Sequence, residues 1–324
     1  MKRVSVFMDV EDPINPLSDD AALDFARLFT QAGVRGSFCL TGEKCRTLVQ
    51  RQRHDVIEAF KHHCLGLHTD THSQHPTTME LLADLEYEEG CRAAHETEAK
   101  GEKAFRTAFD RRPSFWGGAG NTWSPEINSA LLELGIPAYS YALTALPGNA
   151  VHQYCGVLGL PQALSISEDD WMDDSRATDR MDEVIANLNN IGQPWVGIFV
   201  GHPTRFRYRQ FWDFPYAKGR TPEAPVFAEP TDELAYQRGK CNLETFLGRL
   251  AKVSEIVGVD EVTGLPSKIR LPSSEELDYF RQETARNLRS ATGWPIHKPG
   301  LNVEKIVAKT LALEETLRVA TLLD

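Results

Sequence analysis

Residues 66–76 of the chain are Gly66-Leu67-His68-Thr69-Asp70-Thr71-His72-Ser73-Gln74-His75-Pro76, and they continue a short apolar run that begins at Cys64. His68 and His72 are four residues apart, so their imidazoles share one face whether the backbone is a helix or a strand. Two imidazoles on one face can bind a single metal ion. The stretch predicts a buried strand at 64–67 with candidate metal ligands at its carboxyl end, although a histidine pair alone is a weak motif.

Two other apolar runs end in chemically useful side chains. The first run of the chain leads into Asp9-Val10-Glu11-Asp12, and a late run leads into Gly201-His202-Pro203. In parallel α/β folds the carboxyl ends of the strands lie at one edge, where ligand sites collect. We therefore expect Asp9, His68 and His202 to meet at that edge.

Short apolar runs alternate with amphipathic helical patterns, which is typical of strand-helix repeats around a parallel sheet or barrel. The 324 residues, 41% of them hydrophobic, suffice for one large α/β domain with additions. The sequence predicts strands at 4–8, 36–40, 64–67, 113–116, 138–141, 158–166 and 195–200. It predicts helices at 21–32, 56–62, 77–108, 124–134 and 180–189.

Composition excludes several classes of partner. The formal net charge is −11, so neither a nucleic acid nor an anionic membrane surface would attract the protein. The first apolar run stops at Asp9 after about five residues, which indicates a strand rather than an export signal. No run approaches the roughly 20 apolar residues of a membrane span, and we expect a cytoplasmic protein. The six cysteines show no Cys-x-x-Cys spacing, so we expect reduced thiols.

The chain changes character after His202. Residues 204–216 interleave aromatic rings with arginine, and a proline-containing loop continues to residue 230. A loop of this length is often a functional lid, but its rings could equally cover the barrel or a subunit interface. Two later segments, 273–290 and 303–323, have helical patterns. We expect them to pack outside the core or against a second subunit. The protein could therefore be a homo-oligomer.

Together these motifs resemble the polysaccharide deacetylase family, carbohydrate esterase family four, over residues 1–255. Residues 256–324 lie outside the resemblance and are expected to form a C-terminal helical extension. The resemblance implies an α/β fold, a distorted (β/α) barrel with its active site at the carboxyl ends of the strands. The family motif His-Ser/Thr-x-x-His is matched by His68-Thr69-Asp70-Thr71-His72, and the histidine at the end of a late strand is matched by His202.

The chain departs from the family pattern in two places. The family's two acids are adjacent, whereas here Asp9 and Asp12 are separated by Val10-Glu11, so either Glu11 or Asp12 could be the metal carboxylate. The arginine that braces the family's base is missing, because residues 113–123 place glycines and tryptophans where it would stand. Arg111 and Arg112 come early for a substitute. A base without a cationic brace has a higher pKa.

The resemblance assigns a role to each motif. His68, His72 and either Glu11 or Asp12 would bind a divalent metal, with zinc as the first expectation, although this donor set also accepts cobalt, nickel, manganese or iron. Asp9 would be the base and His202 the acid that protonates the departing nitrogen. Two tryptophans offer flat rings on which a sugar could stack, or they fill the core; they are Trp116 and Trp123.

The implied activity is a metal-dependent hydrolase that removes an acetyl group from an N-acetylated sugar, a small molecule or an oligosaccharide, or from a related amide. Two alternatives stay open. One is a hydrolase of a different small amide at the same site, which the missing arginine favours. The other is a non-catalytic member of the fold that only binds carbohydrate, which the missing arginine favours and the presence of both Asp9 and His202 opposes.

Overall fold

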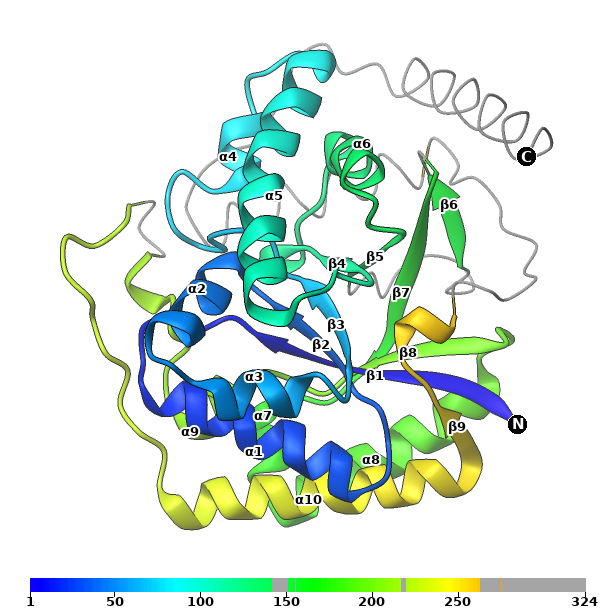
Figure 1. Ribbon diagram of the computed structural model, residues 1–324. Helices are drawn as coiled ribbons and strands as arrows, with labels where there is room; N and C mark the ends of the chain where they lie inside the picture. Colours follow the sequence, from blue (N-terminus) through cyan, green and yellow to red (C-terminus); the bar gives the residue numbers. More distant parts are fainter. Residues whose placement is uncertain (142–150, 155, 217–219, 263–274, 276–324) are drawn as a thin grey trace.

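The computed structural model describes residues 1–141, 151–154, 156–216, 220–262 and 275 (Figure 1). The strands are β1 (Lys2–Val10), β2 (Ser37–Leu40), β3 (Cys64–Leu67), β4 (Trp116–Gly117), β5 (Ala138–Tyr141), β6 (His152–Tyr154), β7 (Val157–Ser165), β8 (Trp195–Phe199) and β9 (Ser254–Ile256). The α-helices are α1 (Leu17–Gln31), α2 (Gly42–Gln50), α3 (His54–Phe60), α4 (Thr78–Leu82), α5 (Tyr87–Phe109), α6 (Pro125–Leu134), α7 (Glu168–Trp171), α8 (Asp174–Asn190), α9 (Pro203–Arg207) and α10 (Glu233–Val253). Short 3-10 helices are η1 (Ala119–Asn121), η3 (Phe214–Tyr216) and η4 (Val259–Glu261).

The strands close into a parallel barrel. Its order is β2-β3-β4-β5-β7-β8-β1, and β1 also pairs with β2, which completes a ring of seven strands. The first half of β1 pairs with β8 and its second half with β2, so β1 is the strand at which the ring closes. Two strands lie outside the ring: β9 pairs parallel with the start of β1, and β6 pairs antiparallel with β7. This confirms the expected (β/α) barrel.

Side-chain alternation along the strands decides which residues enter the barrel. In β1, Val4, Val6, Met8 and Val10 belong to the core between barrel and helices, whereas Phe7 belongs to the core inside the barrel. Asp9 shares the inward face with Phe7, because residues two apart in a strand lie on the same side. The same alternation along β3 puts the side chain of His68 on the same face of the sheet as Cys64 and Gly66. Chain alternation therefore aims Asp9 and His68 into the barrel mouth.

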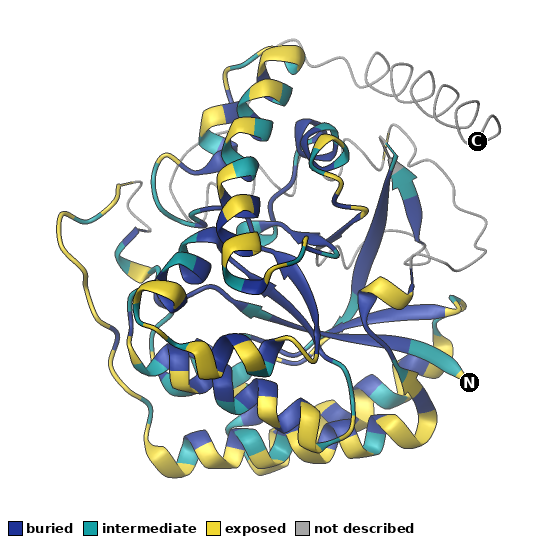
Figure 2. Cartoon of the chain, viewed as in Figure 1, coloured by how far each residue is buried: buried dark blue, intermediate teal, exposed yellow. Residues whose placement is uncertain are grey.

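Helices cover the outside of the barrel (Figure 1). Their buried faces and the outward strand residues form the largest apolar cluster, and Figure 2 shows the exposed residues gathered on the outer helix faces. Among the described residues, no helix is both long and apolar enough to cross a membrane. The described cysteines are free thiols, whereas Cys155 lies outside the described residues.

Some predicted elements were wrong in extent. The single helix expected at 77–108 is two helices, because Glu86 takes an extended backbone and α5 begins anew after it. Thr77 and Glu80 form a capping box that starts the short first helix, α4. Helices α2 and α10 are not among the elements predicted from the sequence. The proposed helical segments 273–290 and 303–323 lie outside the described residues, and the boundary at residue 255 stays a prediction.

Candidate active site

The polar ends of β1, β3 and β8 meet at the mouth of the barrel. They line a cavity of about 280 Å³ together with residues from the loops that follow the other strands. Asp9, Glu11, His68, His72 and His202 all contribute to its wall, as the strand-end argument predicts. Further lining residues are Cys39, Phe115, Gly117, Gly118, Gly120, Asn121, Ser140, Gln162, Phe199, Phe211 and Asp213.

Glu11, His68 and His72 converge on one point. Oε2 of Glu11 lies 3.0 Å from Nε2 of His68 and 2.8 Å from Nε2 of His72. All three side chains are buried, and their nearest ligand atoms lie within 4.8 Å of one another. Burial alone raises the pKa of Glu11, but the neighbouring His72 and His202 outweigh it and hold that pKa well below its ordinary value.

The hydrogen bonds of the two imidazoles indicate what belongs between them. Nδ1 of His68 lies 3.0 Å from the carbonyl oxygen of Gly117, and Nδ1 of His72 lies 2.6 Å from Oγ of Ser73. If both Nδ1 atoms carry the proton of a neutral ring, both Nε2 atoms present a lone pair. Two lone pairs and a carboxylate oxygen at these distances repel one another unless a metal cation lies among them or an Nε2 atom takes up a second proton. The donor set therefore fits a divalent metal with one carboxylate and two histidines.

A turn, rather than a regular element, brings the second histidine back to the first. Thr69 and His72 both have left-handed backbone, with φ of 57° and 53°. Residues other than glycine seldom adopt this backbone conformation. The ring centroids of His68 and His72 end 4.9 Å apart. Strained backbone at non-glycine residues is concentrated at functional sites, and here it serves the convergence of the two imidazoles.

Asp9 and His202 flank this point. Oδ2 of Asp9 lies 3.7 Å from Nε2 of His68 and 3.9 Å from Nε2 of His202. Burial raises the pKa of Asp9, an effect that the neighbouring His68 and His202 only partly oppose. Burial lowers the pKa of His202, but Glu11 and Glu168 outweigh it and raise that pKa to about 9. In the metal-free protein His202 therefore carries a proton at neutral pH, and one of the two carboxylates that keep it there was not among the site residues predicted from the sequence.

Glu168 is that partner. Its Oε1 lies 2.5 Å from Nδ1 of His202 and accepts the backbone N–H of the same residue at 2.8 Å. It is the first residue of α7. Glu168 is 34 residues from His202 in sequence, so no local motif links the two. Its position just after a barrel strand, β7, was the signal that could have identified it.

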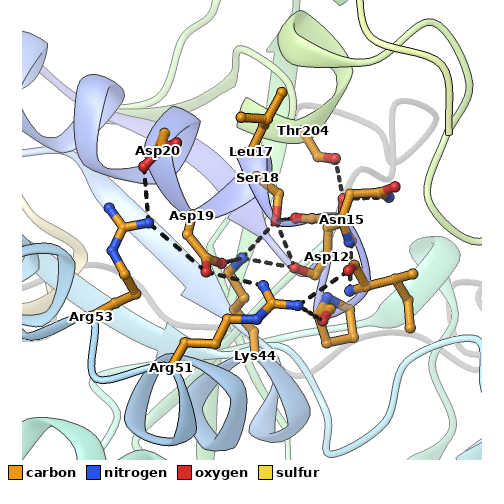
Figure 3. A network of polar contacts seen from close by, with 12 residues as sticks. Asp12, Asn15, Leu17, Ser18, Asp19, Asp20, Lys44, Arg51, Arg53 and Thr204 are labelled. Carbon is orange, nitrogen blue, oxygen red and sulfur yellow. Dashed lines mark hydrogen bonds and ion pairs between the residues drawn. The ribbon is translucent and has the colours of Figure 1, made fainter. Parts of the chain in front are cut away.

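The carboxylate of Asp12 is part of the loop architecture and lies outside the group formed by Glu11, His68 and His72. Its carboxylate accepts four hydrogen bonds, from Ile14 N, Asn15 N, Asn15 Nδ2 and Thr204 Oγ1 at 2.9, 2.9, 2.9 and 2.6 Å. These donors occupy both carboxylate oxygens (Figure 3). Of the two candidates for the metal carboxylate, the structure therefore places Glu11 beside the histidines and Asp12 in a bridge between the loops that carry Glu11 and His202.

A buried charge network supports that bridge (Figure 3). Lys44 reaches from α2 and donates to the backbone oxygen of Asp12 at 2.7 Å, to Oγ of Ser18 at 2.8 Å and to Asp19 at 2.5 Å. Its side chain is fully buried, and that of Asp19 is 2% exposed. Arg51 pairs with the other oxygen of Asp19 at 3.0 Å. The loop after β1 is thus fixed by compensated charges rather than by apolar packing.

Trp116 and Trp123 are core residues, which corrects their prediction as substrate contacts. They are 0% and 2% exposed and pack in an apolar cluster with helix α6. Their indole N–H groups are already used: Trp116 donates to Glu98 at 2.9 Å, and Trp123 donates to Asn128 at 2.8 Å. Neither ring is among the residues that line the cavity.

The packing around Gly117 and Gly118 explains why no arginine stands at these positions. A Cβ atom on Gly117 would lie 2.8 Å from Sγ of Cys39 and 3.1 Å from Nδ1 of His68, and a Cβ atom on Gly118 would lie 2.0 Å from a backbone oxygen. Neither position has room for a side chain. Arg111 donates to the backbone oxygen of His63, which precedes β3, so it lies at the amino end of the barrel and far from Asp9.

Comparison with known proteins gives the fold a context. No family model and no curated protein matches the sequence. A protein from Mycobacterium smegmatis that is assigned as a polysaccharide deacetylase aligns with 84% of this chain and 94% of its own at 13% identity, with a TM-score of 0.53. The 4-alpha-glucanotransferase from Thermococcus litoralis aligns with 89% of this chain and 46% of its own at 12% identity, with a TM-score of 0.54. A CE4 family pseudoenzyme from Bacillus anthracis aligns with 83% and 67% at 11% identity, with a TM-score of 0.45. The chain has the barrel fold of the polysaccharide deacetylases, as the resemblance of its motifs predicts.

Proposed function

We propose that this protein is a metal-dependent hydrolase that removes an acetyl group from an N-acetylated sugar or a related amide. One observation carries the proposal: three ligand atoms of Glu11, His68 and His72 converge, and an acid-base pair, Asp9 and His202, flanks them. A carboxylate and two imidazoles leave coordination positions open, which is typical of catalytic rather than structural metal sites. A binding module would have no use for a base and a protonated acid on the rim of the same cavity.

The residues divide the work of amide hydrolysis. A divalent metal in this site would acidify water and polarise the carbonyl oxygen of the substrate. Asp9 accepts the proton of the attacking water, a role that its raised pKa favours because a stronger base takes the proton more readily. His202 donates a proton to the departing nitrogen, and Glu168 holds the imidazole by its Nδ1 atom. Gly117 orients His68 through its carbonyl oxygen.

The cavity supports a small substrate. A volume of about 280 Å³ lies at the lower end of the range of small-molecule pockets. Ser140 and Gln162 in its wall are neutral, and Nε2 of Gln162 donates to Oγ of Ser140 at 3.3 Å. A monosaccharide or a short oligosaccharide fits this wall, and so does another small amide, which is the second candidate.

Two measurements test the proposal. Elemental analysis of the purified protein should find about one divalent metal per chain, and the His68→Ala and His72→Ala variants should lose it. Acetate release should be measured on N-acetylated amino sugars and on simple N-acetyl amides, with Asp9→Asn as the variant that keeps the metal and loses turnover. Unchanged metal content in both histidine variants would refute the site. Turnover unaffected in Asp9→Asn would refute the assignment of the base.

A further inference from the structure

The chain between α9 and the long loop forms a wall of the active site. We call residues 208–216 the aromatic segment. Three consecutive side chains in it, Phe211, Trp212 and Asp213, reach different parts of the site. The Phe211 ring packs edge to face on the imidazole of His202, with ring centroids 4.7 Å apart. Its two neighbours reach the metal ligands, and they carry the inference.

Trp212 holds the metal carboxylate from the side away from the histidines. Its Nε1–H donates to Oε1 of Glu11 at 3.0 Å, while Oε2 of Glu11 faces the two imidazoles. Trp212 is 1% exposed, and its ring also packs against His72 at a centroid distance of 5.6 Å. A buried donor on one carboxylate oxygen fixes the rotation of the carboxylate, so the other oxygen stays directed at the convergence point.

Asp213 fixes the second histidine through one intermediate residue. Oγ of Ser73 donates to Oδ2 of Asp213 at 2.5 Å and, having spent its proton, accepts from Nδ1 of His72 at 2.6 Å. This chain of donors holds the His72 proton on Nδ1 and leaves the lone pair on Nε2, the atom that faces Glu11. Carboxylates that act on a ligand histidine in this way raise its basicity and orient its ring.

The aromatic segment is itself anchored at both ends, so it can impose this geometry. Tyr208 accepts the backbone N–H of Leu17 at 3.0 Å and forms a bridge with Pro230. At the other end, Nε2 of His75 donates to the backbone oxygen of Tyr216 at 2.9 Å. These contacts hold both ends of the segment against the barrel, and Phe211 and Asp213 line the cavity at its mouth.

We propose that Trp212 and Asp213 are positioning residues of the metal site, which act through Glu11 and through Ser73 and His72. The inference rests on the proposed function, because it presumes that Glu11, His68 and His72 bind a metal. Its consequence is that the metal affinity of the protein depends on a segment about 140 residues away in sequence from the histidine motif. Neither residue needs to touch the substrate or the metal.

Cobalt(II) binding to the purified, metal-free full-length protein tests this without any activity assay. The d–d absorption of bound cobalt reports ligand geometry, and competition with a chromophoric chelator gives the dissociation constant. Trp212→Phe keeps most of the ring and removes the N–H, and Ser73→Ala cuts the link to His72. We expect each variant to bind cobalt about tenfold to a hundredfold more weakly than the unmodified protein, with an altered absorption band.

Trp195→Phe is the matched control. Trp195 is also 1% exposed, and its Nε1–H also makes a 3.0 Å hydrogen bond, to Ser5, but it lies at the amino end of the barrel. The control should lose a similar amount of stability and bind cobalt within twofold of the unmodified protein. If Trp212→Phe and Ser73→Ala also stay within twofold, the inference is overturned, and Ser73→Ala decides alone should Trp212→Phe not fold. An unmodified protein that binds no cobalt would refute the proposed function itself.

Discussion

The two acids after β1 should respond to mutation in opposite ways. Glu11→Gln removes the carboxylate that faces the histidines, so it should abolish metal binding. Asp12→Ala removes no ligand atom, so the metal should stay at about one per chain. The loop that Asp12 bridges loses its acceptor, and the protein should be markedly less stable.

The size of the Asp12 effect follows from its four hydrogen bonds at 2.6 to 2.9 Å. A buried donor that loses its partner costs about 1–3 kcal/mol. Water can enter the space that the carboxylate leaves, and the contributions of one cluster do not add. We therefore expect about 3 kcal/mol in all, or a urea midpoint about 1 M lower for a slope near 3 kcal/mol per M.

Urea denaturation of the metal-free proteins and elemental analysis of the purified ones give the two readouts. The reasoning is refuted if Asp12→Ala loses the metal while its urea midpoint is unchanged, because Asp12 would then be a ligand and not a bridge. A Glu11→Gln variant that retains the metal would refute it equally.

Three further predictions concern groups away from the metal ligands. Burial lowers the pKa of His63 from 6.5 to about 4. The neutral imidazole therefore contributes about 3 kcal/mol to the free energy of unfolding above pH 6.5, and this contribution is lost as the pH falls towards 4. Urea denaturation between these pH values should show a free energy of unfolding that falls with pH, and His63→Gln should reduce this dependence. Glu168→Gln removes the charge beside His202, so the pKa of the acid falls; the alkaline limb of the activity profile should move to lower pH, with the metal content unchanged. Lys44→Met leaves a buried carboxylate without its closest cation and should cost about 3–5 kcal/mol in urea denaturation. The exposed control Lys61→Met should change stability by less than about 0.5 kcal/mol, and equal losses in the two lysine variants would contradict the account.

The strands and the residues at their ends could be predicted because local pattern decides them. The predicted strands at 64–67 and 138–141 have the bounds of β3 and β5. Each is a short apolar run, and alternation then fixes which side chains face inward. Asp9, His68 and His202 were found together for that reason: parallel strands bring their carboxyl ends to one edge whatever lies between them in the chain.

The residues that the sequence could not supply act across the barrel. Glu168 and Trp212 touch functional side chains 34 and 201 residues away, and no local periodicity marks either one. The prediction that Trp116 and Trp123 contact substrate was wrong because the local pattern is ambiguous. An aromatic side chain next to a strand end suits a pocket wall and a core equally well, and the choice depends on whether its N–H finds a buried partner.

Imidazoles take the place of the missing arginine in the charge balance of the barrel mouth. Cys39 is the register neighbour of Asp9 across the pair β1–β2, and with His68 it fills the space beside Gly117 where a side chain would begin. Two carboxylates, the buried Glu11 and the partly exposed Asp9, thus share the mouth with imidazoles in place of a guanidinium. In the metal-free protein the imidazoles must take up protons to balance them, which agrees with the raised pKa of both His68 and His202: burial lowers these values, but the nearby acids outweigh it. A divalent cation in the proposed site would supply the same compensation while leaving His68 neutral.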